Sequence, residues 1–294
     1  MVRKILSLDG GGIRGASTAT FLNQLEKASG KPLHQIFSLI AGTSTGGIIA
    51  AAIGILKMPG DNLVNLYDHE NGKEIFPQSF WDQTLPIQNQ PKYDGKGKRN
   101  MLKKYFGKRL LKSSKMPLIL TAYDVENRIP VILKSTDKDK TKALDAVDAT
   151  SAAPTFFPTV QVNNQWLIDG GVIVNNPTMT AYAEAKKLWP DDEIRVFSVG
   201  TGKRTRRIPG EESQDYGAIG WLTHDLIGIV TDETIVDMQA ETILGDNYIR
   251  VNSNLDLADD DIDNIKQGNI TNLRNLGEEW WTKFGSDTFT LLSK

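Results

Sequence analysis

The stretch IFSLIAGTSTGGIIAAAIGIL, residues 36–56, decides the fold. Its apolar start, residues 36–41, is typical of a buried strand, and its small and apolar end, residues 47–56, is typical of a buried helix. The stretch has no charged residue and is long enough to cross a bilayer. Glycine, serine and threonine between Gly42 and Gly46 divide it, however, so we expect strand, tight turn and helix rather than a membrane span.

The same alternation continues on both sides of this stretch. A strand at 4–8 precedes a glycine cluster and a helix at 16–28, and further elements follow. We expect strands at 117–123, 129–134, on both sides of Asn163 and Asn164, at 194–199 and at 248–251, and helices at 101–106, 142–149 and 181–188. This order predicts an α/β fold, a three-layer αβα sandwich with a mainly parallel central sheet. The loose segment 72–115 is expected to cross the edge of the sheet.

Length and composition fit one globular domain, residues 1–294. The chain is 39% hydrophobic and 24% charged, which provides a core and gives no signature of disorder. A net charge of −2 argues against a nucleic-acid binder. Cysteine is absent and the N-terminus lacks the apolar core of a signal peptide, so we expect a cytoplasmic protein.

The glycine cluster DGGGIRG, residues 9–15, contains G-x-G-x-x-G at Gly10, Gly12 and Gly15. A dinucleotide site also requires an acidic residue at the end of the second strand, where this chain has Ser44 instead. The same glycines expose backbone N–H groups at a helix N-terminus, and such groups stabilise an anion. A developing oxyanion is one such anion.

The second cluster, G-T-S-T-G, matches the nucleophile elbow G-x-S-x-G at a strand-to-helix junction. Gly42 and Gly46 are expected to leave room for the strand and helix backbones to approach, so that Ser44 projects outward as a nucleophile. An ordinary connection that happens to contain serine is the alternative.

A serine nucleophile needs a base, and the chain has three histidines. We expect His34 to lie at the far end of the nucleophile strand and His69 to close a helix, so both are predicted to be structural. The order Ser44, Asp169, His224 would suit a triad, but His224 lies in a helix-like run rather than in a loop after a strand.

Asp169 is the stronger candidate for the base. It follows a predicted strand and precedes Gly170 and Gly171, which allow other backbone to approach the carboxylate. Active sites of parallel sheets lie at such strand ends. With a reference pKa of about 3.9, Asp169 needs a site of low polarity that raises this value. A turn-forming Asp-Gly is the competing interpretation.

DGGGIRG, GTSTG and DGG (169–171), in this order, together resemble the patatin-like phospholipase family. ATSAAPTFFP (149–158), NNP (175–177) and KYDGKGKRNMLKKYFG (92–107) are similar to the same family, so the resemblance covers almost the whole chain. It implies the patatin-like variant of the α/β-hydrolase architecture.

The resemblance also implies a lipid acyl hydrolase that cleaves fatty acyl esters through an acyl-enzyme, a phospholipase A or a lysophospholipase-type esterase. The implied dyad is Ser44 as nucleophile and Asp169 as base, with no histidine. Gly10, Gly11 and Gly12 would form the oxyanion hole, and Arg14 would fix this loop or meet phosphate. No cofactor and no metal are implied.

Three surface features remain. Residues 92–115 contain ten Lys or Arg and one acidic residue, which favours anionic lipid headgroups or is simply a solvated basic helix. Aromatic residues could line an acyl groove or enter a lipid interface: Phe76, Phe80, Trp81, Phe156 and Phe157. The acidic run 256–263 starts like a calcium-binding loop but has Asn264 where glycine is needed and Ile270 where glutamate is needed, so we expect no metal.

The expected partners are therefore a phospholipid or other acyl-lipid substrate and a membrane surface, contacted transiently and peripherally. A dinucleotide-dependent enzyme and a catalytically silent lipid-binding protein of the same fold are the alternatives. The first lacks its acidic residue. The second would not need to keep Ser44, Asp169 and all three loop glycines.

Overall fold

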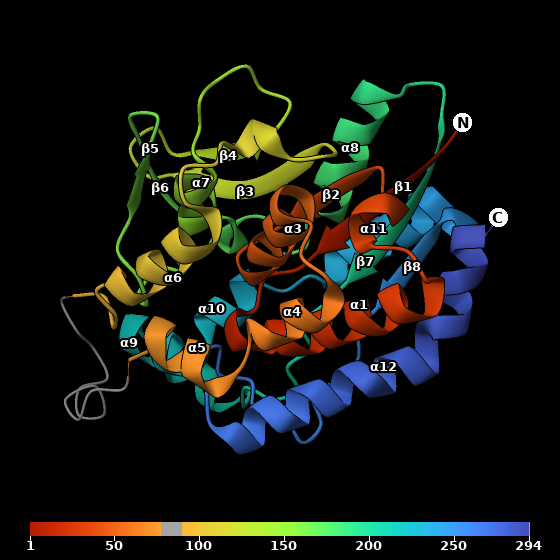
Figure 1. Ribbon diagram of the computed structural model, residues 1–294. Helices are drawn as coiled ribbons and strands as arrows, with labels where there is room; N and C mark the ends of the chain where they lie inside the picture. Colours follow the sequence, from red (N-terminus) through yellow and green to blue (C-terminus); the bar gives the residue numbers. More distant parts are fainter. Residues whose placement is uncertain (78–89, 294) are drawn as a thin grey trace.

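The computed structural model describes residues 1–77 and 90–293. Figure 1 shows a central sheet between two layers of helices, as predicted for a three-layer αβα sandwich. The described strands are β1 (Val2–Leu8), β2 (Leu39–Gly42), β3 (Leu118–Asp124), β4 (Ile129–Lys134), β5 (Val160–Val162), β6 (Gln165–Asp169), β7 (Glu193–Val199) and β8 (Tyr248–Val251). The five strands in the order β3-β2-β1-β7-β8 are parallel to one another. At the β3 end of the sheet, β4 and β6 pair with β3 and β5 pairs with β6, all antiparallel.

The helices cover both faces of the sheet. One face packs against α1 (Gly15–Ser29), α3 (Thr45–Leu56) and α12 (Gln267–Ser293), and the other against α8 (Thr178–Leu188) and α11 (Thr234–Leu244). The remaining described helices are α2 (Leu33–Ile36), α4 (Gly60–Asn65), α5 (His69–Ile75), α6 (Lys96–Phe106), α7 (Ala143–Thr150), α9 (Ala218–Thr223) and α10 (Leu226–Val230). Among the described helices, none combines the length and apolar composition that crossing a bilayer requires.

Alternation along the parallel strands produces two cores. In β1, Leu6 and Leu8 face the larger core with α1 and α3, while Ile5 faces the smaller core with α8 and α11. From Ile5 to Leu8 the strand is thus buried on both faces, which explains why three of these four residues are apolar. The predicted strand at 36–41 is shorter than expected, because a helical turn follows Pro32 and β2 starts only at Leu39.

The pairings of strand β3 position the candidate site. One edge of β3 pairs with β4 along its length. Its other edge is shared, because β2 pairs with its first half, Gly42 opposite Leu120, and β6 with its second half, Asp169 opposite Ala122. Since β2 runs parallel and β6 antiparallel to β3, their carboxyl ends point toward each other. The residues that follow β2 and the last residue of β6 therefore meet beside the middle of β3.

Candidate active site

Ser44 occupies a sharp turn between β2 and α3. Its φ of 54° and ψ of −123° are unusual for a residue with a side chain, and such backbone strain costs about 1–3 kcal/mol. A Cβ on Gly42 would overlap the Gly46 backbone, and one on Gly46 would overlap the carbonyl of Leu8. Both glycines are therefore required by the close approach of strand and helix. The turn presents Ser44 to a cavity rather than to the core.

Asp169 lies at the end of β6, buried with 4% of its surface exposed. Its Oδ1 accepts the N–H of Gly171 at 2.7 Å, and its carboxylate lies beside the Ser44 side chain. Burial raises the pKa of Asp169 to about 6, although the Ser44 side chain, the N–H of Gly171 and the charge of Lys98 oppose this rise. A Cβ on Gly170 would overlap Thr121 of β3, so this glycine lets the chain turn beside the sheet. Asp169 is thus placed and tuned to accept a proton near neutral pH.

The glycine loop lies across the cavity from Asp169. The N–H of Gly10 donates to the Asn175 carbonyl at 3.1 Å. Among the hydrogen bonds of the described residues, none uses the N–H of Gly11 or Gly12, and both line the cavity with Ser44. Buried Arg14 secures this loop, because its Nε donates to the Gly11 carbonyl at 3.2 Å and its Nη1 to the Gly202 carbonyl at 3.2 Å.

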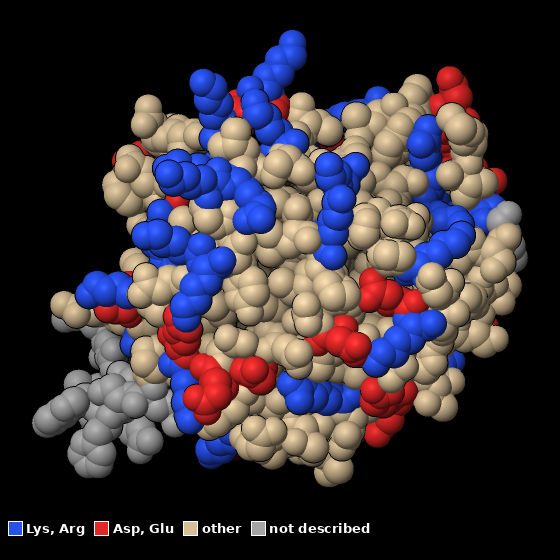
Figure 2. Space-filling view, viewed as in Figure 1, with Lys and Arg blue, Asp and Glu red and all other residues tan. Residues whose placement is uncertain are grey.

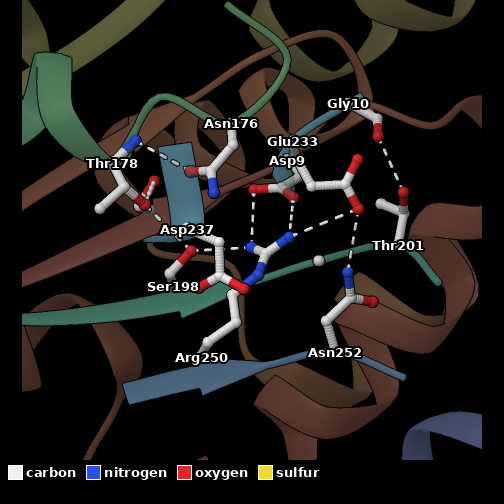
Figure 3. A network of polar contacts seen from close by, with 12 residues as sticks. Asp9, Gly10, Asn176, Thr178, Ser198, Thr201, Glu233, Asp237, Arg250 and Asn252 are labelled. Atoms are coloured by element: carbon white, nitrogen blue, oxygen red, sulfur yellow. Dashed lines mark hydrogen bonds and ion pairs between the residues drawn. The ribbon is translucent and has the colours of Figure 1, made fainter. Parts of the chain in front are cut away.

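A buried polar network anchors the residue that precedes these glycines (Figure 3). Both carboxylate oxygens of Asp9 accept from Arg250, at 3.1 and 2.5 Å, and Arg250 also donates to Ser198 at 2.8 Å. Burial raises the pKa of Asp9 to about 7, against the opposing charge of Arg250. Thr201 then donates to the Gly10 carbonyl at 2.8 Å. Sequence reasoning missed Arg250, and no local signal in β8 distinguishes it.

Two cavities meet at Ser44 and differ in chemistry. The smaller one, about 50 Å³, is bordered mainly by apolar side chains, including Ile48, Ile75 and Phe157. The larger one, about 210 Å³, has a mainly apolar lining that also contains charged side chains. The charged lining residues are Arg14, Arg204, Arg206, Asp225, Asp261 and Asp263, together with Asp169.

The three histidines lie elsewhere. His69 begins α5 instead of ending a helix, so that prediction was wrong; Asp68 caps this helix by accepting the N–H of Asn71, and the His69 ring contacts the Ile265 carbonyl. His34 lies in α2, before β2. His224 ends α9, exposed, with its ring stacked on Tyr216 at 4.2 Å. Among the described residues, no histidine lines either cavity at Ser44.

The basic segment 92–115 is less uniformly positive than its composition suggests. Figure 2 shows basic side chains over the part of the surface where α6 and β4 lie, with acidic ones interspersed below. Ion pairs join Lys92 to Asp263, Lys96 to Asp94, Arg99 to Asp145 and Asp148, and Lys104 to Glu74. Within the described chain, no ion pair involves Lys103, Lys108, Arg109, Lys112 or Lys115.

The predicted aromatic residues divide between the two cavities. Phe157 and Phe76 line the smaller, apolar cavity, with ring centroids 5.8 Å apart, and Phe156 lines the larger one. Phe80 and Trp81 lie outside the described residues.

The acidic run brings the carboxylates of three residues within 4.8 Å of one another: Asp259, Asp260 and Asp261. A group of exposed carboxylates alone does not indicate a metal, and metal independence stays a prediction.

Comparison with known proteins identifies the family. A sequence model of patatin-like phospholipases matches residues 6–182. Patatin-like protein 1 of Arabidopsis thaliana is 30% identical over 342 residues, covering 95% of this chain and 81% of that protein. The calcium-independent phospholipase A2-gamma of Homo sapiens is 30% identical over 271 residues, covering 85% of this chain but only 34% of that protein. The crystal structure of VipD from Legionella pneumophila aligns with a TM-score of 0.48 and 11% identity, covering 94% of this chain and 67% of that chain. Since the family model spans more than half of the sequence and the plant relative nearly all of it, the chain belongs to the patatin-like phospholipase family.

Proposed function

We propose that this protein is a lipid acyl hydrolase, a serine carboxylic-ester hydrolase of the phospholipase A or lysophospholipase type. The observation that carries the proposal is that the Ser44 side chain lies beside buried Asp169, where an apolar cavity meets a second cavity that carries charged side chains. An ester with a fatty acyl chain on one side and a polar headgroup on the other matches this division. Membership of the family supports the same substrate class.

The reaction would proceed through an acyl-enzyme. Asp169, as carboxylate, accepts the hydroxyl proton of Ser44 while Oγ attacks the acyl carbonyl. The N–H groups of Gly11 and Gly12 then hydrogen-bond the oxyanion, since the N–H of Gly10 is already bound to Asn175. Collapse of the intermediate breaks the ester bond, and Asp169 returns its proton to the leaving alcohol oxygen. In the second half, Asp169 takes a proton from water as the water oxygen attacks the acyl carbonyl. Collapse of this second intermediate breaks the bond between the acyl carbon and Oγ, Asp169 returns the proton to Oγ of Ser44, and the fatty acid is released.

We further propose that the protein is cytoplasmic and contacts a membrane surface transiently. Two features support the membrane contact. The cations of segment 92–115 that have no ion pair within the described chain, such as Lys103 and Lys108, would attract anionic headgroups. On α10, the apolar side chains of Ile227 and Ile229 are exposed, and Ile227 lines the larger cavity. Such side chains enter a lipid interface at a low free-energy cost.

The test is hydrolysis of a medium-chain p-nitrophenyl ester in EDTA by wild type and three variants. Ser44→Ala and Asp169→Asn should abolish turnover while retaining the fold, and His224→Ala should leave it unchanged. An inactive but folded His224→Ala would replace the dyad by a triad. If wild type itself is inactive and binds liposomes, the silent lipid-binding protein is the better description.

A further inference from the structure

A buried lysine that the proposed mechanism does not use lies beside the dyad. Lys98 of α6 is 2% exposed and lines the apolar cavity together with Ser44. Its Nζ is 4.3 Å from the ring centroid of Phe157. An ammonium group in such a place is unfavourable unless it is fully hydrogen-bonded and paired.

The hydrogen bonds of Lys98 and its pairing with Asp148 favour its protonated form, although burial and the charge of Arg99 lower its pKa. Its Nζ donates to the carbonyl of Ser151 at 2.7 Å, to the carbonyl of Asp148 at 3.1 Å and to the hydroxyl of Ser151 at 3.2 Å. It also lies 3.1 Å from Oδ1 of Asp148. Carbonyl and carboxylate oxygens can only accept, so a neutral amine would leave some of them without a donor. The Asp148 carboxylate also pairs with Arg99, whose Nη1 lies 2.8 Å from its Oδ2, so Asp148 neutralises only part of the Lys98 charge.

The segment that Lys98 holds also holds both members of the dyad. The hydroxyl of Thr150 accepts the N–H of Ser44 at 3.2 Å. Two residues later, the carbonyl of Ala152 accepts the N–H of Asp169 at 3.0 Å. Ser151, between them, is the residue whose carbonyl and hydroxyl bind Lys98. Three consecutive residues at the end of α7 thus connect the nucleophile, the buried cation and the base.

We propose that Lys98 is a positioning residue for the dyad: it fixes residues 150–152 between Ser44 and Asp169, and its positive charge favours the carboxylate form of Asp169. The inference rests on the proposed function, because it assumes that Asp169 is the base. Lys98 does not contact the reacting atoms in this role. It acts through the backbone of Ser151 and through its electric field.

The charges around Asp169 support the electrostatic part. Lys98 of α6 lowers the pKa of Asp169, against the larger opposite effect of burial. Asp148 of α7 pairs with both Lys98 and Arg99 of α6. Loss of the Lys98 charge should therefore make Asp169 harder to ionise.

The experiment compares the pH dependence of kcat/KM for a soluble ester in wild type, Lys98→Gln and Lys96→Gln. Glutamine keeps two N–H donors for the Ser151 carbonyl but removes the charge. The acid limb is the fall of kcat/KM as the pH decreases through the pKa of Asp169, near pH 6 in wild type. We expect this limb to move to higher pH in Lys98→Gln, so that activity is lost mainly at and below pH 6 and little at pH 8. Lys96, on the same helix and 83% exposed, is the matched control and should leave the limb in place.

A second variant keeps the test decisive if Lys98→Gln does not fold. Lys98→Met removes the same charge with an apolar side chain that suits burial against the Phe157 ring, so the limb should again move to higher pH. A limb that stays at the wild-type position in a folded Lys98→Gln or Lys98→Met overturns the inference while the dyad stands. If Asp169→Asn retains wild-type activity, the proposed function and this inference both fail.

Discussion

Replacing Arg250 by methionine tests how the glycine loop is held. The change removes both hydrogen bonds to the carboxylate of Asp9, which is only 1% exposed, and leaves that carboxylate without its cation. Removing one partner of a buried pair costs about 3–5 kcal/mol. That is a large part of the total stability of about 5–15 kcal/mol of a typical protein.

The pH dependence distinguishes this loss from a packing defect. In wild type the pKa of Asp9 is raised to about 7, so folded Asp9 is half ionised at pH 7 and almost fully ionised, as in the unfolded state, from about pH 8 upward. Asp9 therefore contributes little to the pH dependence of wild-type stability in this range. Without Arg250 the folded-state pKa rises further, so between pH 7 and 9 folded Arg250→Met binds a proton that the unfolded chain has lost. Its free energy of unfolding should therefore fall by up to about 1.4 kcal/mol per pH unit. Between pH 7 and 9, the ionisation of Asp9 changes the free energy of unfolding of wild type only slightly.

Urea unfolding followed by tryptophan fluorescence at pH 7, 8 and 9 measures both effects. Arg206→Met is the control, because its guanidinium is 58% exposed and its ion pairs are expected to contribute about 0–1 kcal/mol. If Arg250→Met costs no more than this control, or shows no added pH slope, Asp9 is not held as a buried carboxylate by Arg250.

Three further predictions concern catalysis. Asp169 must be ionised to act as a base, so kcat/KM of wild type should fall through a midpoint near pH 6, about ten-fold by pH 5; a midpoint near pH 4 in a pH series would contradict the role of burial. Gly12 has a φ of 59° and a Cβ there would overlap the Ile262 carbonyl, so Gly12→Ala should reduce ester hydrolysis at least about ten-fold. Gly12→Ala should also lose more stability than the control Gly30→Ala. At Gly30 φ is 63° but no atom lies near the added Cβ, so a loss of about 1 kcal/mol is expected there. Equal losses of the two variants in urea unfolding would contradict the overlap at Gly12. Ile75→Phe narrows the apolar cavity, so the ratio of octanoyl to butyryl ester hydrolysis should fall, and an unchanged ratio would remove the acyl chain from that cavity.

The local part of the site could be predicted from sequence because its physical cause is local. Gly42 and Gly46 flank Ser44 in the chain, and the overlap that would exclude a Cβ at Gly42 involves the backbone of Gly46 itself. The strand, the turn and the helix of small residues also follow one another directly in the chain, so the sequence of one short stretch indicates all three. The elbow was therefore predicted to within a few residues.

The rest depends on pairings between distant segments. Asp169 was expected at the carboxyl edge of a parallel sheet, but β6 is antiparallel to β3, and it reaches Ser44 because β2 and β6 meet on one edge of β3. The strand pairing, rather than the sequence pattern, decides this. Similarly, Arg250 is 241 residues from Asp9, and nothing near either residue indicates the other.

Charge counts were misleading for a similar reason. Residues 92–115 look like a basic surface in the sequence, yet Lys104 pairs with Glu74, and Lys98 is buried beside the dyad. The partners come from other segments, so a count within one segment cannot separate an exposed cation from a paired or buried one.

The most direct measurement of the central claim is mass spectrometry of the protein after reaction with an alkyl fluorophosphonate, which phosphonylates activated serines. We predict one adduct, on the peptide that carries Ser44, no adduct in Ser44→Ala, and much slower labelling in folded Asp169→Asn, because Asp169 must accept the Ser44 proton. A label on another residue, or labelling of Asp169→Asn at the wild-type rate, would contradict the Ser44 and Asp169 dyad.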